Sequence, residues 1–358
     1  QSQSNLPAFN VPNLSKFKTY NGEALMRAVS WSGDGSVLAA ASGDADADVH
    51  VYKRGVKGAK LNHEVDGGVA PRGVAIDGAG QQVWVVSESG GEFFLTRVTG
   101  LGWGKCGTRF PTIIGTDGND TITGTPGDDV IKTGDGNDTV DAGNGNDAIC
   151  TEQGDDTIIA GPGDDFVDGG PDRDLFTFKG VSSLGVTVDL SQKTSTGYGD
   201  KTVRRIENVI GSLGDDTLSG DARVKTLDGD EGDDSIDGLG KTDFLSGGPG
   251  LDYIEGGFGN DKIYGDGGDD LLIGEGGNDT ILGNNGDDVL AGVAGDDTLN
   301  GGTGADTASF AIATGRITAS LDTGNATGEG TDKLKNIEWL VGSEQDDTLV
   351  GNAKVNLL

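Results

Sequence analysis

The feature that most constrains this chain is a nine-residue period that runs through its C-terminal two-thirds. Seven consecutive nonapeptides occupy 115–177, eleven occupy 211–309, and one more occupies 342–350, which makes nineteen units. The unit 256–264 reads Gly-Gly-Phe-Gly-Asn-Asp-Lys-Ile-Tyr. Position six is Asp in eighteen of the units, and position eight is apolar in all nineteen. A disordered chain has no reason to keep this phase, so the period predicts an ordered repeat structure.

The residue types at each position predict how one unit folds. Glycines let the first six residues turn through backbone conformations that a Cβ atom obstructs. The last three residues form a short strand, whose central side chain at position eight points inward because strand side chains alternate. One unit cannot bury its single apolar residue, whereas two units complete a coil and stacked coils bury two apolar columns. The period therefore predicts a parallel β-solenoid for residues 111–358.

The acidic residues are concentrated in the same part of the chain. Residues 1–110 hold 11 Lys and Arg against 10 Asp and Glu, whereas 111–358 hold 15 against 49. Stacking at roughly 4.8 Å per coil brings position-six carboxylates together, with a repulsion on the order of 3 kcal/mol per pair at an effective dielectric near 20. A cation bound between neighbouring carboxylates turns this repulsion into attraction. Carboxylates and turn carbonyls form an all-oxygen ligand set, which suits calcium better than zinc, copper or magnesium.

The candidate calcium ligands are the aspartates at position six of the units. Neighbouring aspartates on the same edge of the stack lie eighteen residues apart. They are Asp120, Asp129, Asp138, Asp147, Asp156, Asp165, Asp174, Asp216, Asp234, Asp243, Asp252, Asp261, Asp270, Asp279, Asp288, Asp297, Asp306 and Asp347. The sequence points to no catalytic residues and to no cofactor other than calcium ions.

On these nineteen units, residues 115–358 resemble the RTX (repeats-in-toxin) calcium-binding β-roll. The resemblance implies an all-β, right-handed parallel β-roll in which position-six Asp and the backbone carbonyls of adjacent turns bind calcium. It also implies a domain that is disordered without calcium. The sequence departs from the family pattern at 220–228, where Arg223 and Lys225 replace the Gly and the Asp. It departs again at 238–246, where Lys241 takes the fourth position.

Two tracts without the nonapeptide pattern, 178–210 and 310–341, repeat each other at an offset of 131. They are similar to tracts that interrupt RTX arrays, and their alternating apolar residues predict strands that continue the stack as longer coils. The chain stops at Leu358 inside a degenerate unit, whereas solenoids normally end in a polar cap. We therefore expect either a fragment or an end that another molecule covers. End-to-end self-assembly through open coil edges is one such arrangement.

Residues 1–110 predict a small antiparallel β-domain that precedes the β-roll. Residues 27–55 align with 72–100 at an offset of 45, and each copy predicts a strand, a Gly-rich turn and two more strands. The two copies weakly resemble β-propeller blades, which have a similar period. A truncated propeller, a small sandwich and a module completed by another subunit are the alternatives. A plain β-domain without a catalytic role is the favoured interpretation.

The two cysteines, Cys106 and Cys150, flank the start of the acidic region. In an extracellular protein the simplest expectation is a disulfide between them, and two unpaired buried thiols are the alternative. Similar cysteine placement in secreted RTX-like proteins supports the bond. The chain begins at Gln1 rather than Met, which indicates a removed signal peptide. We expect a secreted, extracellular or cell-surface protein of bacterial origin.

Several function classes do not fit this sequence. A chain with a net charge of −33 repels nucleic-acid phosphate, and no apolar run approaches the ~20 residues of a membrane span. Neither His-Glu-x-x-His nor, in 1–110, Gly-x-Ser-x-Gly occurs. We therefore expect a non-enzymatic calcium-binding protein with a structural or adhesive role, whose partners are calcium, itself or a cell-surface ligand. The alternative is a calcium-dependent secretion or stability domain of a secreted hydrolase or toxin-like protein.

Overall fold

The computed structural model describes residues 105–109, 111–180, 184–223 and 225–358, together with the backbone of seven strands between positions 26 and 98. The chain divides into two compact units, Gln1–Trp103 and Gly104–Leu358. Residues 1–25 and the connections between the first seven strands lie outside the described residues.

The strands of the first unit pair in antiparallel fashion. One sheet has the order β1-β2-β3-β4 and the other has the order β5-β6-β7. The strand bounds are β1 (Met26–Trp31), β2 (Val37–Ser42), β3 (Asp48–Lys53), β4 (Leu61–Glu64), β5 (Pro71–Ile76), β6 (Val83–Ser89) and β7 (Glu92–Val98). The small β-domain and its two blade-like repeats stay predictions, because the residues that connect these strands are not described.

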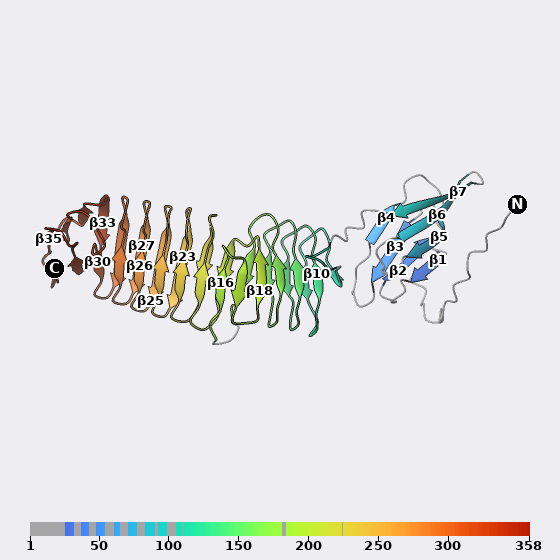
Figure 1. Cartoon of the computed structure of the whole chain (residues 1–358), viewed down its shortest axis with the longest axis horizontal. Helices are drawn as coiled ribbons and strands as arrows, with labels where there is room; N and C mark the ends of the chain where they lie inside the picture. The colour runs from blue at the N-terminus through green and yellow to red at the C-terminus, as the bar shows by residue number, and fades with distance from the viewer. Residues whose placement is uncertain are drawn as a thin grey trace. The chain divides into compact units, whose positions relative to one another are not determined.

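The second unit is a β-solenoid built from two long sheets, which Figure 1 shows as a row of stacked strands from β10 to β35. The first sheet contains, in spatial order, β8 (Ile113–Ile114), β10 (Val130–Lys132), β12 (Ala148–Cys150), β14 (Phe166–Asp168), β18 (Lys201–Arg204), β17 (Thr194–Thr196), β16 (Thr187–Asp189), β20 (Thr217–Ser219), β22 (Ser235–Asp237), β24 (Tyr253–Glu255), β26 (Leu271–Ile273), β28 (Val289–Ala291), β30 (Thr307–Ser309) and β34 (Trp339–Val341).

The second sheet contains, in spatial order, β9 (Thr121–Thr123), β11 (Thr139–Asp141), β13 (Thr157–Ile159), β15 (Leu175–Thr177), β19 (Asn208–Ile210), β21 (Thr226–Asp228), β23 (Phe244–Pro249), β25 (Lys262–Gly267), β27 (Thr280–Asn285), β29 (Thr298–Thr303), β33 (Thr331–Lys335), β32 (Asn325–Thr327), β31 (Thr318–Ser320) and β35 (Thr348–Val350). Successive units of the repeat alternate between the two sheets.

The register of the sheets follows the repeat. Ile263 in β25 pairs in parallel with Leu245 in β23 and with Ile281 in β27, so neighbours in a column are two units apart. The side chains at position eight are buried from Ile131 to Ala308 and form one continuous core, which also contains Leu340 of the second tract. At the first and last units, Ile122 and Leu349 pack against this core but are only partly buried. The predicted parallel β-solenoid is confirmed, with its core where the period placed it.

The two tracts between the unit blocks differ from the longer coils that the sequence predicted. In the first tract, β18 stacks in parallel on β14, β17 pairs antiparallel with β18 and with β16, and β16 then pairs in parallel with β20. The second tract makes the same arrangement with β33, β32 and β31 in the other sheet. Each tract is too long for one coil, and the antiparallel turn takes up the excess while keeping every strand paired.

A disulfide joins Cys106 to Cys150, as the sequence predicted. Cys106 is fully buried in a small cluster with Val130 and Ala148, against which Phe166 packs. The bond therefore attaches the segment before the first unit to the fourth unit. Among the described residues, no helix is long and apolar enough to cross a membrane.

Candidate calcium sites

The turns that precede each strand adopt conformations that depend on glycine at particular positions. In the unit 274–282, Glu275 at position two has φ 67° and Gly277 at position four has φ 142°. A Cβ atom on Gly277 would lie 1.3 Å from the carbonyl oxygen of Gly259, one coil earlier. No side chain fits there, so position four brings the backbones of successive turns into close contact.

Within each block of units, the position-six carboxylates form a ladder along each edge of the solenoid. The backbone N–H of Asp261 donates to Oδ1 of Asp279 at 2.8 Å, and the N–H of Asp279 donates to Oδ1 of Asp297 at 2.8 Å. On the other edge, the N–H of Asp252 donates to Oδ1 of Asp270 at 2.9 Å. From the third unit of each multi-unit block onward, Oδ1 therefore accepts the N–H of the residue eighteen positions earlier, which is the neighbour that the sequence predicted.

The second carboxylate oxygen has no partner in most of these residues. The Oδ2 atoms of thirteen aspartates are buried without a hydrogen bond: Asp138, Asp147, Asp156, Asp174, Asp234, Asp243, Asp252, Asp261, Asp270, Asp279, Asp288, Asp297 and Asp306. A buried acceptor left without a partner costs about 1–3 kcal/mol, and more when it is charged. Thirteen such atoms in two columns point to a ligand that carries positive charge.

Burial raises the pKa of each of the thirteen carboxyls whose Oδ2 atom is unpartnered. Burial, followed by the charge of neighbouring aspartates, raises the pKa of Asp252, Asp270 and Asp279 to about 7. For Asp174, burial together with the charges of Asp156 and Glu207 raises the pKa to about 8. The calcium-free solenoid therefore favours the neutral acids, and keeping them charged requires a compensating cation.

Four predicted ligands differ because their own turn satisfies the second oxygen. Each stands in a unit with Ser or Thr at position two, and these residues donate from both backbone N–H and hydroxyl groups. The pairs are Asp120 with Thr116, Asp129 with Thr125, Asp216 with Ser212, and Asp347 with Ser343. We call these units the Ser/Thr-capped units. They are the first two units of the solenoid and the unit that follows each interrupting tract.

Asp165 is the remaining predicted ligand, and its second oxygen contacts a lysine. The Lys201 ammonium lies 2.7 Å from Oδ2 of Asp165, and both side chains are fully buried. In the unit 220–228, Lys225 itself takes position six, and its side chain is also fully buried. The backbone N–H of Lys225 donates to Oδ1 of Asp243 at 2.6 Å, so the ladder of hydrogen bonds starts again at this residue, whose own side chain has no acceptor oxygen.

Asp332 is a further residue of the ladder that was not among the predicted ligands. Its Oδ1 atom accepts a hydrogen bond from the N–H of Asp297 at 3.1 Å, and burial raises its pKa to about 6. Residues 327–335 read Thr-Gly-Glu-Gly-Thr-Asp-Lys-Leu-Lys, which keeps the glycines at positions two and four and the Asp at position six. These positions were the signal that a degenerate unit lies within the second tract.

The ligand set available to a metal ion consists of oxygen atoms. In the described part of the chain, no three His, Cys, Asp or Glu side chains gather as a metal-binding group. For a cation in the turns, the ligand set of backbone carbonyls together with one or two carboxylates stays a prediction from the sequence. Flexible coordination by oxygen is the preference of calcium. The unpartnered buried Oδ2 atoms fit such an ion.

Comparison with known families agrees with this geometry. The family described as RTX calcium-binding nonapeptide repeat (4 copies) matches residues 114–149, 151–176, 205–222, 210–245, 226–254, 239–272, 246–281, 273–308 and 336–353. None of these ranges lies within 1–110, where the blade-like resemblance stays a prediction. A comparison with curated protein sequences gave no significant match. The matched ranges cover just over half of the chain, which therefore belongs to the RTX calcium-binding nonapeptide-repeat family.

Proposed function

We propose that the chain is an extracellular, non-enzymatic calcium-binding protein with a structural or adhesive role, whose solenoid folds when calcium enters its turns. The observation that carries the proposal is the set of thirteen buried Oδ2 atoms without a partner. A folded chain that leaves these charges uncompensated opposes its own stacking, because each carboxylate faces the next along the column. Bound calcium supplies the compensating charge and completes the oxygen coordination.

The residues of the chain have distinct tasks in this process. The position-four glycines let successive turns approach, and the position-six N–H groups hold Oδ1 of the next carboxylate in place. The apolar column at position eight provides the burial that drives the coils together. Because a single unit buries only one apolar side chain, coils form together rather than one at a time. Folding is therefore expected to depend cooperatively on calcium.

The proposed location is outside the cell. Millimolar calcium there fills weak sites and adds stability by mass action. The Cys106–Cys150 disulfide supports the same location, because structural disulfides persist in oxidising compartments. End-to-end assembly of the solenoid and attachment to a cell-surface ligand belong to the same proposal. Light scattering of the full chain with and without millimolar calcium tests assembly, and a monomer under both conditions would exclude it.

The test of the calcium sites compares two Asp-to-Asn variants that remove the same charge from neighbouring turns. Asp279→Asn changes a buried position-six residue whose Oδ2 atom is unpartnered. Asp269→Asn changes an exposed position-five residue that accepts a hydrogen bond from the N–H of Asp287 at 2.8 Å, which an amide oxygen also accepts. Native mass spectrometry, which resolves single bound ions, should show fewer calcium ions in Asp279→Asn and an unchanged number in Asp269→Asn. Equal numbers in both variants would exclude Asp279 as a ligand.

A further inference from the structure

Lys201 lies in a cage of oxygen atoms. Its ammonium is 2.7 Å from the carbonyl oxygen of Gly161, 2.8 Å from that of Gly163, 2.9 Å from that of Tyr198, and 2.7 Å from Oδ2 of Asp165. An ammonium group has three protons, so four oxygens surround a group that donates to three. Three carbonyls and one carboxylate around a buried positive charge form the ligand class that calcium uses. We call these four atoms the Lys201 oxygen cage.

The position of Lys201 in the repeat is that of a calcium ligand. Residues 196–204 read Thr-Gly-Tyr-Gly-Asp-Lys-Thr-Val-Arg, with glycines at positions two and four and Lys201 at position six. The strand that follows stacks on β14, with Thr202 paired to Phe166. Lys201 therefore occupies the place next to Asp165 where the ladder elsewhere continues with another aspartate.

The second tract supplies the natural comparison, because Asp332 stands where Lys201 stands in the first. The two turns share a backbone hydrogen bond: the N–H of Gly163 donates to the carbonyl of Tyr198 at 3.4 Å, and the N–H of Gly295 donates to that of Glu329 at 3.2 Å. Oδ2 of Asp297, the counterpart of Asp165, has no partner. One copy thus holds an ammonium in its turn, whereas the other presents a second carboxylate and an unpartnered oxygen.

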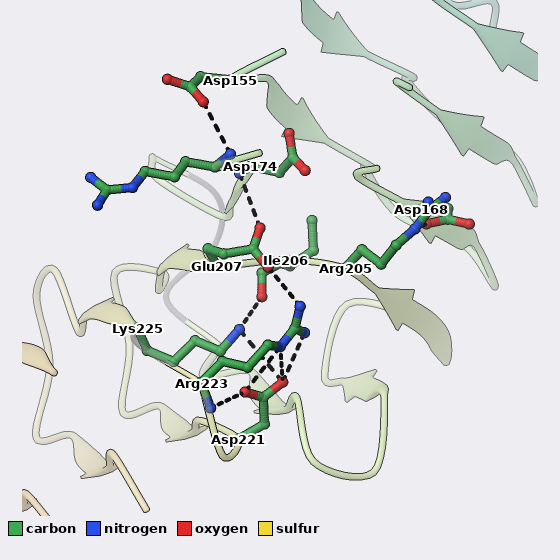
Figure 2. A network of polar contacts seen from close by, with 10 residues as sticks. Asp155, Asp168, Asp174, Arg205, Ile206, Glu207, Asp221, Arg223 and Lys225 are labelled. Atoms are coloured by element: carbon green, nitrogen blue, oxygen red, sulfur yellow. Dashed lines mark hydrogen bonds and ion pairs between the residues drawn. The ribbon is translucent and has the colours of Figure 1, made fainter. Parts of the chain in front are cut away.

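Lys225 is a second buried lysine at position six that contacts oxygen atoms, in the other column of the solenoid, and Figure 2 shows its partners. Its ammonium donates to the carbonyl oxygen of Ile206 and lies 3.6 Å from Oδ2 of Asp221. Arg223 pairs with both Asp221 and Glu207 at 2.9 Å. Glu207 in turn accepts a hydrogen bond from the N–H of Asp174 at 3.3 Å. Positive side chains of the protein therefore face the ladder on both edges where the first tract interrupts the repeat.

We propose that the ammonium groups of Lys201 and Lys225 are covalently attached substitutes for calcium ions at the junction around 178–210. This inference rests on the proposed function, since it assumes that calcium fills the equivalent turns elsewhere. An ion attached to the chain cannot dissociate. The junction between the two blocks of units therefore keeps its compensating charge at every calcium concentration, whereas the turns on either side depend on the external ion.

Reciprocal substitutions test the proposal on the full-length chain by native mass spectrometry across a calcium titration. Lys201→Asp reproduces the residue of the second tract and should bind one calcium ion more than the wild type. Asp332→Lys reproduces the residue of the first tract and should bind one fewer. Lys225→Asp, which restores the repeat pattern, should also gain one ion. Lys201→Met replaces the charged side chain by a long uncharged one. It should bind as many calcium ions as the wild type and unfold at a lower urea concentration in saturating calcium.

The outcomes separate this inference from the proposed function. A wild-type chain that binds no calcium would contradict the proposed function itself. If the wild type binds calcium, and the folded Lys201→Asp and Asp332→Lys variants bind the same number of calcium ions as the wild type, only the inference that lysine replaces calcium is overturned. If Lys201→Asp does not fold, Asp332→Lys decides, because an unchanged count in that variant alone refutes the proposal. A urea midpoint of Lys201→Met equal to that of the wild type would also refute it.

Discussion

Replacing Asp279 by Asn should change the stability of the solenoid in opposite directions with and without calcium. The Asp279 side chain is 2% exposed, its Oδ1 atom accepts the N–H of Asp261, and its Oδ2 atom has no partner. An amide keeps the acceptor for Asp261 and removes the charge. Without calcium the variant loses a buried charge that nothing compensates, whereas with calcium it loses a ligand.

The magnitude follows from the ionisation of the carboxyl. Burial, followed by the charges of Asp297 and Asp261, raises the pKa of Asp279 from 3.8 to about 7. One pKa unit corresponds to about 1.4 kcal/mol, so charging this group in the calcium-free fold above pH 7 costs roughly 4 kcal/mol. Asp279→Asn should recover up to that amount in chelator at pH 8. In saturating calcium it should instead destabilise the fold, because a charged ligand is lost.

The assay is far-UV circular dichroism under two conditions. In chelator at pH 8, sulfate promotes folding because it strengthens apolar burial, and the sulfate midpoint of Asp279→Asn should lie below that of the wild type. In saturating calcium, the urea midpoint of the same variant should lie below that of the wild type. Asp269→Asn, the exposed control, should move neither midpoint appreciably. Shifts of the same sign under both conditions would show that the Asp279 carboxylate is not a charge that calcium compensates.

Three further predictions concern the rest of the solenoid. A pKa raised on folding contributes stability that is present below the unfolded value near 3.8 and is lost as pH rises through the folded value of about 7. Sulfate-induced folding in chelator should therefore become easier as pH falls from 8 to 5, and a pH-independent midpoint would contradict this. Leu272→Ala removes part of a fully buried apolar column and should lower the free energy of unfolding by about 2–5 kcal/mol in urea with calcium present. An unchanged urea midpoint would contradict this prediction. Cys106→Ser with Cys150→Ser opens a loop with a sequence separation of 44 and should lower stability by about 4 kcal/mol; equal unfolding midpoints of the oxidised wild type and the double variant would exclude that contribution.

The period of the sequence predicted the columns of the solenoid because side-chain alternation leaves no freedom in a three-residue strand. Ile263 at position eight has to face inward, and a shift by one residue would expose the whole column. The pairing of Cys106 with Cys150 was also predictable, since the chain holds two cysteines and the family resemblance supported the bond. The antiparallel turns of the interrupting tracts were not predictable in this way. Parallel and antiparallel strands show the same alternation of apolar residues, so the pattern does not give their direction.

The predicted ligand list was uniform, whereas the structure divides it into groups. The hydroxyl of Ser212 donates a hydrogen bond to Asp216, four residues later in the chain. Such a local Ser-to-Asp spacing can be read from the sequence. The contact between Lys201 and Asp165 was not, because the two residues lie 36 positions apart and meet only through the antiparallel turn of the tract. Lys225 was recognised as a departure, but its burial depends on the coil before it. Long-range contacts of this kind are known only from the three-dimensional structure.

The central claim is that calcium is the ligand of the buried aspartate columns and that the solenoid needs it to fold. The most direct measurement is the far-UV circular dichroism spectrum of the full chain at pH 8 in chelator, followed by titration with calcium and, separately, with magnesium. We expect a largely disordered spectrum for 111–358 in chelator and a cooperative gain of β signal with calcium. Magnesium should be much less effective because it gives up its water reluctantly. A full β signal in chelator that calcium leaves unchanged would show that the solenoid folds without calcium.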